Sequence, residues 1–112
     1  MKFSVSEKDN IKIIALEGKI MGTPEDELFI DKIYEFVDHD FCKVVVDLSE
    51  VTWMNSRGLG MCLKGLTTLR NRGGDLRLAN LSQNVQSLME KCRILTVFRS
   101  FDSVEKAAAS FK

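Results

Sequence analysis

Alternating apolar residues open the chain and predict two β-strands joined by a tight turn. The first strand is expected over residues 3–7 and the second over residues 11–16, with Asp9 and Asn10 between them. Because Asp-Asn suits a short turn between antiparallel strands, we expect an N-terminal β-hairpin. Gly18 is expected to end the second strand.

A helix is predicted after the hairpin. Thr23 is a suitable N-cap, Pro24 suits the first helical position, and the acidic residues that follow favour the positive end of the helix dipole. Apolar residues then recur at helical spacing and are expected to face the core. These residues are Phe29, Ile33, Phe36 and Val37.

The middle of the chain predicts a buried strand and a second helix. The β-branched run over residues 43–48, KVVVDL, is typical of a strand that is central in its sheet. The helix is expected over residues 56–71 and should end at Gly73 and Gly74. Its buried face is predicted to consist of Leu59, Cys62, Leu63, Leu66 and Leu69.

Two further strand–helix pairs are predicted. The strands are expected over residues 76–79 and 96–101, and Ser82 is the expected cap of the helix between them. The inward residues of that helix would be Val85, Leu88, Met89 and Cys92. Asp102 with Glu105 resembles a capping box for a closing helix, and the buried stripe of that helix would be Val104, Ala107, Ala108 and Phe111.

This order of elements predicts the fold class. After the hairpin, strands alternate with helices, which indicates an α/β protein with right-handed crossovers. A chain of 112 residues is long enough for one core but not for two. We therefore expect a single domain over residues 1–112, with a small mixed β-sheet and helices packed against it.

Composition and charge narrow the class of protein. Hydrophobic and charged residues make up 45% and 29% of the chain, no apolar run could span a membrane, and the first residues do not resemble a secretion signal. A cytoplasmic protein is expected. Residues 1–56 hold 6 basic and 12 acidic side chains, and residues 57–112 hold 10 and 4. The basic residues are scattered, which argues against nucleic-acid binding, so we expect solvated faces of opposite sign that could also orient a protein partner.

Neither cysteine nor histidine points to a metal or a cofactor. Cys42, Cys62 and Cys92 do not have the spacing of a zinc site or of a disulfide framework. Their apolar neighbours predict buried, reduced thiols. His39 lies in a polar turn without a second metal ligand nearby.

The candidate chemistry lies at the hinge between the buried strand and the second helix, in the sequence NSRGLG. Known phosphate-binding loops do not fit it. Gly58 and Gly60 supply G-x-G, but Leu63 occupies the position of the third glycine in a dinucleotide fingerprint. Gly60 and Gly65 match the spacing of a P-loop, but Leu66 occupies the place of its lysine.

Ser56 is the hydroxyl at this hinge. It has no histidine or carboxylate pair placed to act as a base, so the sequence does not indicate an enzyme. A phosphate attached to Ser56 would bring about −1.5 to −2 charges to the positive end of a helix. The alternative is that Asn55 or Ser56 is only the helix N-cap, worth about 1 kcal/mol. Spacing alone leaves both interpretations open.

The segment VVVDLSEVTWMNSRGLGMCL, residues 44–63, resembles the core motif of STAS domains of the bacterial anti-sigma factor antagonist type. In that family a buried strand ends in D-L-S-x-V, and an aromatic residue and M-D-S-S/T-G-L-G then open a helix. The resemblance implies a non-enzymatic regulator that binds an anti-sigma factor, itself a serine kinase. Phosphorylation of the serine prevents binding, and a serine phosphatase restores it.

By position, the resemblance makes Ser56 the phosphorylated residue. Asn55 stands where the family has aspartate, and Arg57 where it has serine or threonine. The family's Gly-Leu-Gly is present as Gly58, Leu59 and Gly60. Asn55 is as good an N-cap as aspartate, and Arg57 could pair with a phosphate or face solvent.

A partner surface is expected beside the hinge. Met21, Met61 and Lys64 are the candidate contact residues, and the alternative is that Met21 packs inside and Met61 is an isolated exposed residue. Trp53 is expected in the core, with Met54 pointing the other way. The protein is expected to be a monomer or a weak dimer. The alternative function is a STAS docking or scaffold subunit of a transporter or signalling complex without a phosphorylation cycle.

Overall fold

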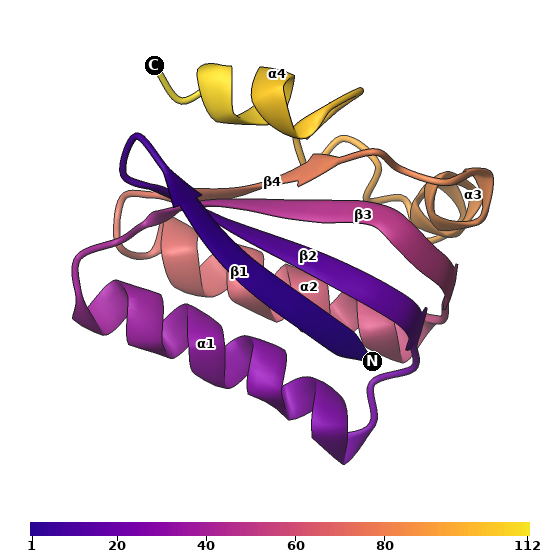
Figure 1. Ribbon diagram of the computed structural model, residues 1–112. Helices are drawn as coiled ribbons and strands as arrows, with labels where there is room; N and C mark the ends of the chain where they lie inside the picture. Colours follow the sequence, from indigo (N-terminus) through magenta and orange to yellow (C-terminus); the bar gives the residue numbers. More distant parts are fainter.

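The computed structural model describes residues 1–112, which form one five-stranded sheet with helices on both faces (Figure 1). The elements in chain order are β1 (Lys2–Lys8), β2 (Ile11–Ile20), the 3-10 helix η1 (Pro24–Asp26), α1 (Glu27–Asp38), β3 (Lys43–Met54), α2 (Ser56–Arg70), β4 (Asp75–Ala79), α3 (Gln83–Lys91), β5 (Ser100–Phe101) and α4 (Val104–Ala109). The strand order is β1-β2-β3-β4-β5. β1 pairs antiparallel with β2, and all other pairs are parallel. The predicted mixed α/β fold is confirmed.

The first half of β3 is covered from both sides. Val44 and Val46 belong to the large buried cluster that includes the inward faces of α1 and α2. Val45 points to the opposite face and belongs to a smaller cluster with Ala107 and Ala108 of α4. Burial on both faces explains why this strand is a continuous β-branched run rather than an alternating one.

The hairpin and the first helix form as the sequence predicts. Asp9 and Asn10 both have positive φ, at 53° and 66°, as a tight two-residue turn between antiparallel strands requires. Pro24 opens the helical segment behind Thr23, although its first turn is the 3-10 helix η1. Gly18 does not end β2 as predicted. It lies inside the strand with φ at +87°, where the pairing of β2 with β3 shifts register.

Two expectations, for Cys92 and for the last strand, are wrong, and the expectation for Leu63 is met only in part, since Leu63 packs against the edge of the core. Leu63 is only half-buried, because the inward stripe of α2 runs through Leu59, Cys62, Leu66 and Leu69 and Leu63 lies at its flank. Cys92 follows the last residue of α3 and is exposed. The last strand has two residues instead of six. In the segment before it, Phe98 is buried in the core, and the side chain of Arg70 in α2 donates a hydrogen bond to the carbonyl of Val97.

The closing helix has a different cap from the predicted one. The hydroxyl of Ser103 accepts a hydrogen bond from the N–H of Lys106 at 3.1 Å, which makes Ser103 the N-cap. Asp102 precedes the cap and is exposed. The prediction placed the cap one residue early because aspartate and serine are equally good caps and spacing cannot choose between neighbours. At α3, by contrast, Ser82 is the cap as predicted.

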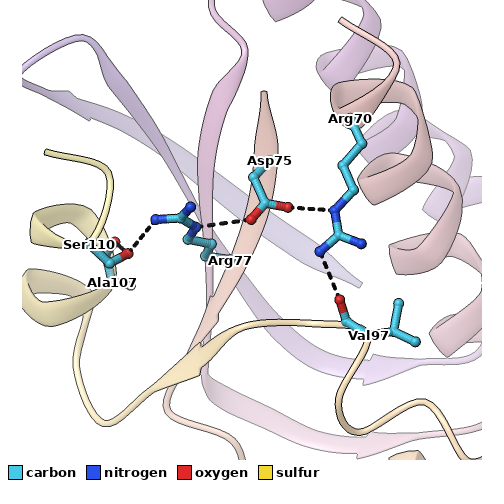
Figure 2. A network of polar contacts seen from close by, with 6 residues as sticks. All are labelled: Arg70, Asp75, Arg77, Val97, Ala107 and Ser110. Atoms are coloured by element: carbon cyan, nitrogen blue, oxygen red, sulfur yellow. Dashed lines mark hydrogen bonds and ion pairs between the residues drawn. The ribbon is translucent and has the colours of Figure 1, made fainter. Parts of the chain in front are cut away.

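A chain of ion pairs centred on Asp75 connects the two faces of the sheet (Figure 2). Its carboxylate accepts hydrogen bonds from Arg70 of α2 and Arg77 of β4, both at 3.0 Å. Arg77 also donates to the hydroxyl of Ser110 beyond α4, and Arg70 donates to the carbonyl of Val97, each at 2.8 Å. The carboxylate is only 13% exposed, so these contacts are partly shielded from water.

We expect Asp75→Asn to lower the free energy of unfolding by about 1–2 kcal/mol, because the partly buried Arg77 and the more exposed Arg70 both lose their counter-charge. Asp102→Asn is the matched control. Asp102 lies 3.8 Å from Lys106 in a pair that is almost fully exposed, so we expect no measurable change. Urea unfolding followed by circular dichroism measures both. Equal effects would show that the network of Asp75 contributes nothing.

The three cysteines differ in exposure, which corrects the prediction that all are buried. Cys42 is half-buried, Cys62 is buried and Cys92 is exposed. Burial raises the pKa of Cys62 to about 12, with a smaller contribution from the negative charge of Asp26. Its thiol is therefore protonated and unreactive at neutral pH.

A thiol reagent at pH 8 should modify Cys92 fastest and Cys42 more slowly. Cys62 should react only when the protein unfolds, because its raised pKa and its burial both suppress the thiolate. Mass spectrometry of peptides after timed labelling, with and without urea, checks this order. Native labelling of Cys62 at the rate of Cys92 would contradict the packing of α2.

Candidate functional site

Asn55 joins the end of β3 to the start of α2. Its side-chain Oδ1 accepts a hydrogen bond from the N–H of Gly58 at 2.9 Å, so Asn55 is the N-cap. Its own N–H donates to the carbonyl of Ile20 at 3.2 Å, which fixes the cap to the end of β2. Ser56 is then the first helical residue and is exposed. Because Asn55 does the capping, the hydroxyl of Ser56 is free for another purpose.

The two glycines of the motif have different surroundings. A Cβ on Gly58 would lie 2.3 Å from the carbonyl oxygen of Ile20, so only glycine lets α2 start this close to β2. A Cβ on Gly60 would meet nothing within 4 Å, and this residue is exposed. Leu59 between them is buried in the core. Gly58 and Leu59 are therefore packing residues, and Gly60 keeps the surface of the first turn open.

A buried carboxylate holds the loop that lies beside this helix start. Asp26 is 1% exposed, and its Oδ2 accepts hydrogen bonds from the N–H groups of Met21, Gly22 and Thr23 at 3.2, 2.8 and 3.2 Å. Gly22 has φ at +74°, and a Cβ there would lie 2.5 Å from the Cβ of Arg57. The loop is thus fixed directly against the first turn of α2.

A cleft of about 290 Å³, the α1–α2 cleft, lies on one side of the helix start. It is lined by Gly22, Thr23, Asp26, Glu27, Ile30, Arg57, Gly60, Met61 and Lys64. Among the predicted contact residues, Met21 is 36% exposed at the adjoining loop and Lys64 is exposed on α2. Met61 is only 9% exposed, which corrects its placement on the outward face. It packs against the core, because the loop and α1 close over this side of α2.

A second groove, the α2–α3 groove, lies on the other side of the helix start. Its lining residues are Trp53, Met54, Asn55, Ser56, Asn84, Ser87, Leu88 and Lys91, and its volume is about 290 Å³. Trp53 is 47% exposed, so the prediction that it lies in the core is wrong. Neighbouring side chains of a strand point to opposite faces, and Met54, at 1% exposure, is the one that points inward.

The residues of α3 in this groove were not predicted as part of a site. Asn84, Ser87, Leu88 and Lys91 are spaced three or four apart and therefore share one face of the helix. The side chain of Asn84 accepts a hydrogen bond from the N–H of Met54 at 3.1 Å, which ties α3 to the end of β3. The recurring polar residues on an otherwise amphipathic helix were the available signal.

Other parts of the molecule are less informative about function. The largest cleft, of about 470 Å³, lies at the carboxyl ends of β4 and β5, beside the middle of β3, and contains none of the predicted site residues. No three His, Cys, Asp or Glu side chains are grouped so that they could hold a metal ion. None of the helices combines the length and the apolar character that crossing a bilayer requires.

A family model for the STAS domain matches residues 2–107 of this chain. BtrV of Bordetella bronchiseptica, a proposed anti-sigma factor antagonist, is 30% identical over 112 residues, which cover 100% of this chain and 96% of that protein. The chain therefore belongs to the STAS domain family.

Solved structures confirm the fold. A proposed anti-sigma factor antagonist from Thermotoga maritima superposes with a TM-score of 0.87 at 18% identity, covering 96% of this chain and 92% of that one. The phosphorylated form of SpoIIAA from Bacillus gives 0.77 at 17% identity, covering 99% and 100%. A sulfate transporter family protein from Wolinella succinogenes gives 0.71 at 16% identity, covering 92% and 85%. At these identities the likeness concerns the fold alone.

We expect Gly58→Ala to destabilise the protein by about 1–3 kcal/mol, because its Cβ would overlap the Ile20 carbonyl. Gly60→Ala, two residues further along the same helix, should stabilise it by about 0.5–1 kcal/mol, since alanine is the better helix former and meets no neighbour. Thermal and urea unfolding of the two variants checks the opposite signs. Equal losses would mean that both glycines are needed for backbone conformation.

Proposed function

We propose that this protein is a cytoplasmic anti-sigma factor antagonist that regulates transcription through partner switching. In its unmodified form it binds an anti-sigma factor that is also a serine kinase, and this binding frees the sigma factor. The kinase phosphorylates Ser56, which ends the interaction, and a serine phosphatase restores it. The observation that carries the proposal is an exposed Ser56 at the first position of α2, left free because Asn55 caps the helix.

The first turn of α2 suits a phosphate. The hydroxyl oxygen of Ser56 would attack the γ-phosphorus of ATP, ADP would leave, and the hydroxyl proton would pass to a base of the kinase. The phosphate would then sit at the positive end of the helix dipole. Asn55 makes the capping bond with a neutral amide oxygen, so it adds no negative charge beside the phosphate. The modification changes the surface and leaves the core untouched.

The unmodified protein would present its partner with the rim of the α1–α2 cleft. Met21 offers exposed apolar surface, and Arg57 and Lys64 offer positive charge. Ser56 precedes Arg57 in the chain and lies at the helix start that separates this cleft from the α2–α3 groove. A doubly negative group there would oppose any partner that approaches the two cations with carboxylates.

Substitution of Ser56 tests the switch. A cognate anti-sigma kinase with ATP should add one phosphate to the wild type and none to Ser56→Ala. Ser56→Ala should bind the kinase like the wild type, because the cap bond of Asn55 remains. Ser56→Asp should bind roughly tenfold more weakly, about 1.4 kcal/mol, because it places negative charge at the interface. Calorimetry measures the affinities, and intact-mass spectrometry counts the phosphates.

Two outcomes would redirect the proposal. If the kinase binds but transfers no phosphate, the double variant Asn55→Asp, Arg57→Ser should restore transfer, since these are the two departures from the family motif. If Ser56→Ala and Ser56→Asp both bind like the wild type, Ser56 has no switching role. The protein would then be a constitutive STAS docking subunit, and affinity purification would recover a transporter or scaffold complex rather than a kinase.

A further inference from the structure

The α2–α3 groove is lined by one charged side chain. Ser56 at the start of α2 lines the same groove. Of the residues that line this groove, only Lys91 has a charged side chain. Lys91 is the last residue of α3. The inward side of this helix is fixed, since Val85 and Met89 are buried in the core and Asn84 is hydrogen-bonded to the backbone of Met54. Lys91 therefore lies on a helix whose position at the groove is fixed by packing.

Arg57 is adjacent to Ser56 in sequence but is directed to the other side. Its Cβ packs against Gly22, and its side chain lines the α1–α2 cleft rather than the α2–α3 groove. Ser56, in contrast, lines the α2–α3 groove and not the α1–α2 cleft. The cation on the same side as the serine hydroxyl thus comes from a different helix.

We propose that a phosphate on Ser56 pairs with Lys91 and so bridges α2 and α3 across the groove. The inference rests on the proposed function for the phosphate itself. The ammonium group supplies three N–H donors, and the phosphate supplies three acceptor oxygens and nearly two negative charges. Trp53 lines the same groove, so we expect the bridge to reduce its exposure. Phosphorylation thereby withdraws an exposed aromatic ring and a lysine from the surface in addition to adding charge.

The test requires no kinase if phosphoserine is installed at position 56 during translation. Titration of the phosphate by ³¹P NMR then reports its second pKa directly. A nearby ammonium favours the dianion, so Lys91→Gln should raise this pKa by roughly 0.2–0.7 unit relative to the wild type, the range of a partly exposed ion pair. Lys91→Arg should restore the wild-type value. Lys64→Gln, a lysine removed from the other cleft, is the matched control and should leave the pKa unchanged.

Fluorescence of Trp53, the one tryptophan of the chain, gives an independent measurement. Phosphoserine at position 56 should reduce quenching of Trp53 by acrylamide in the wild type but not in Lys91→Gln. Equal phosphate pKa values in Lys91→Gln and Lys64→Gln would overturn the inference, and so would a shift that appears only in Arg57→Gln. Failure of every anti-sigma kinase to phosphorylate Ser56 would instead refute the proposed function, while the measured pairing would stand.

Discussion

β3 lies between β2 and β4, and its first half has both faces covered. The positions of α1, α2 and α4 follow from this burial. Val44 and Val46 face the cluster shared with α1 and α2, and Val45 faces α4. A strand buried on both sides has to be paired on both edges, here by β2 and β4. Its carboxyl half continues along β2, where Met54 pairs with Ile20, and it delivers Asn55 and Ser56 to the surface at the start of α2.

Structural and functional tasks are divided among neighbouring residues at that start. Asn55 caps α2 and binds the end of β2, and Gly58 allows the close approach to Ile20. Asp26 holds the adjoining loop through three backbone N–H groups. Because these residues hold the turn, Ser56 is exposed and is not needed to cap the helix. A modification of its hydroxyl can therefore change recognition without a large cost in stability.

The helix start separates two surface depressions of different character. On the α1 side the cleft carries Arg57 and Lys64 together with Glu27, so it is rich in charge. On the α3 side the groove is polar and aromatic and has Lys91 as its one charge. A phosphate at this boundary would act on both sides, by opposing an acidic partner at the cleft and by engaging the lysine of the groove. One phosphate on Ser56 would therefore be enough to change both surfaces.

Local chemistry in the sequence determined the hairpin turn at Asp9 and Asn10, the cap at Ser82 and the order of strands and helices, because each depends on a few adjacent residues. Side-chain placement at the ends of elements depended on tertiary packing. Strand alternation allows either Trp53 or Met54 to point inward, and the packing of Met54 in the large core cluster decided which. Met61 is covered because the loop held by Asp26 folds over it. Lys91 lies 35 positions from Ser56 in the chain, and no local pattern could bring the two into one groove.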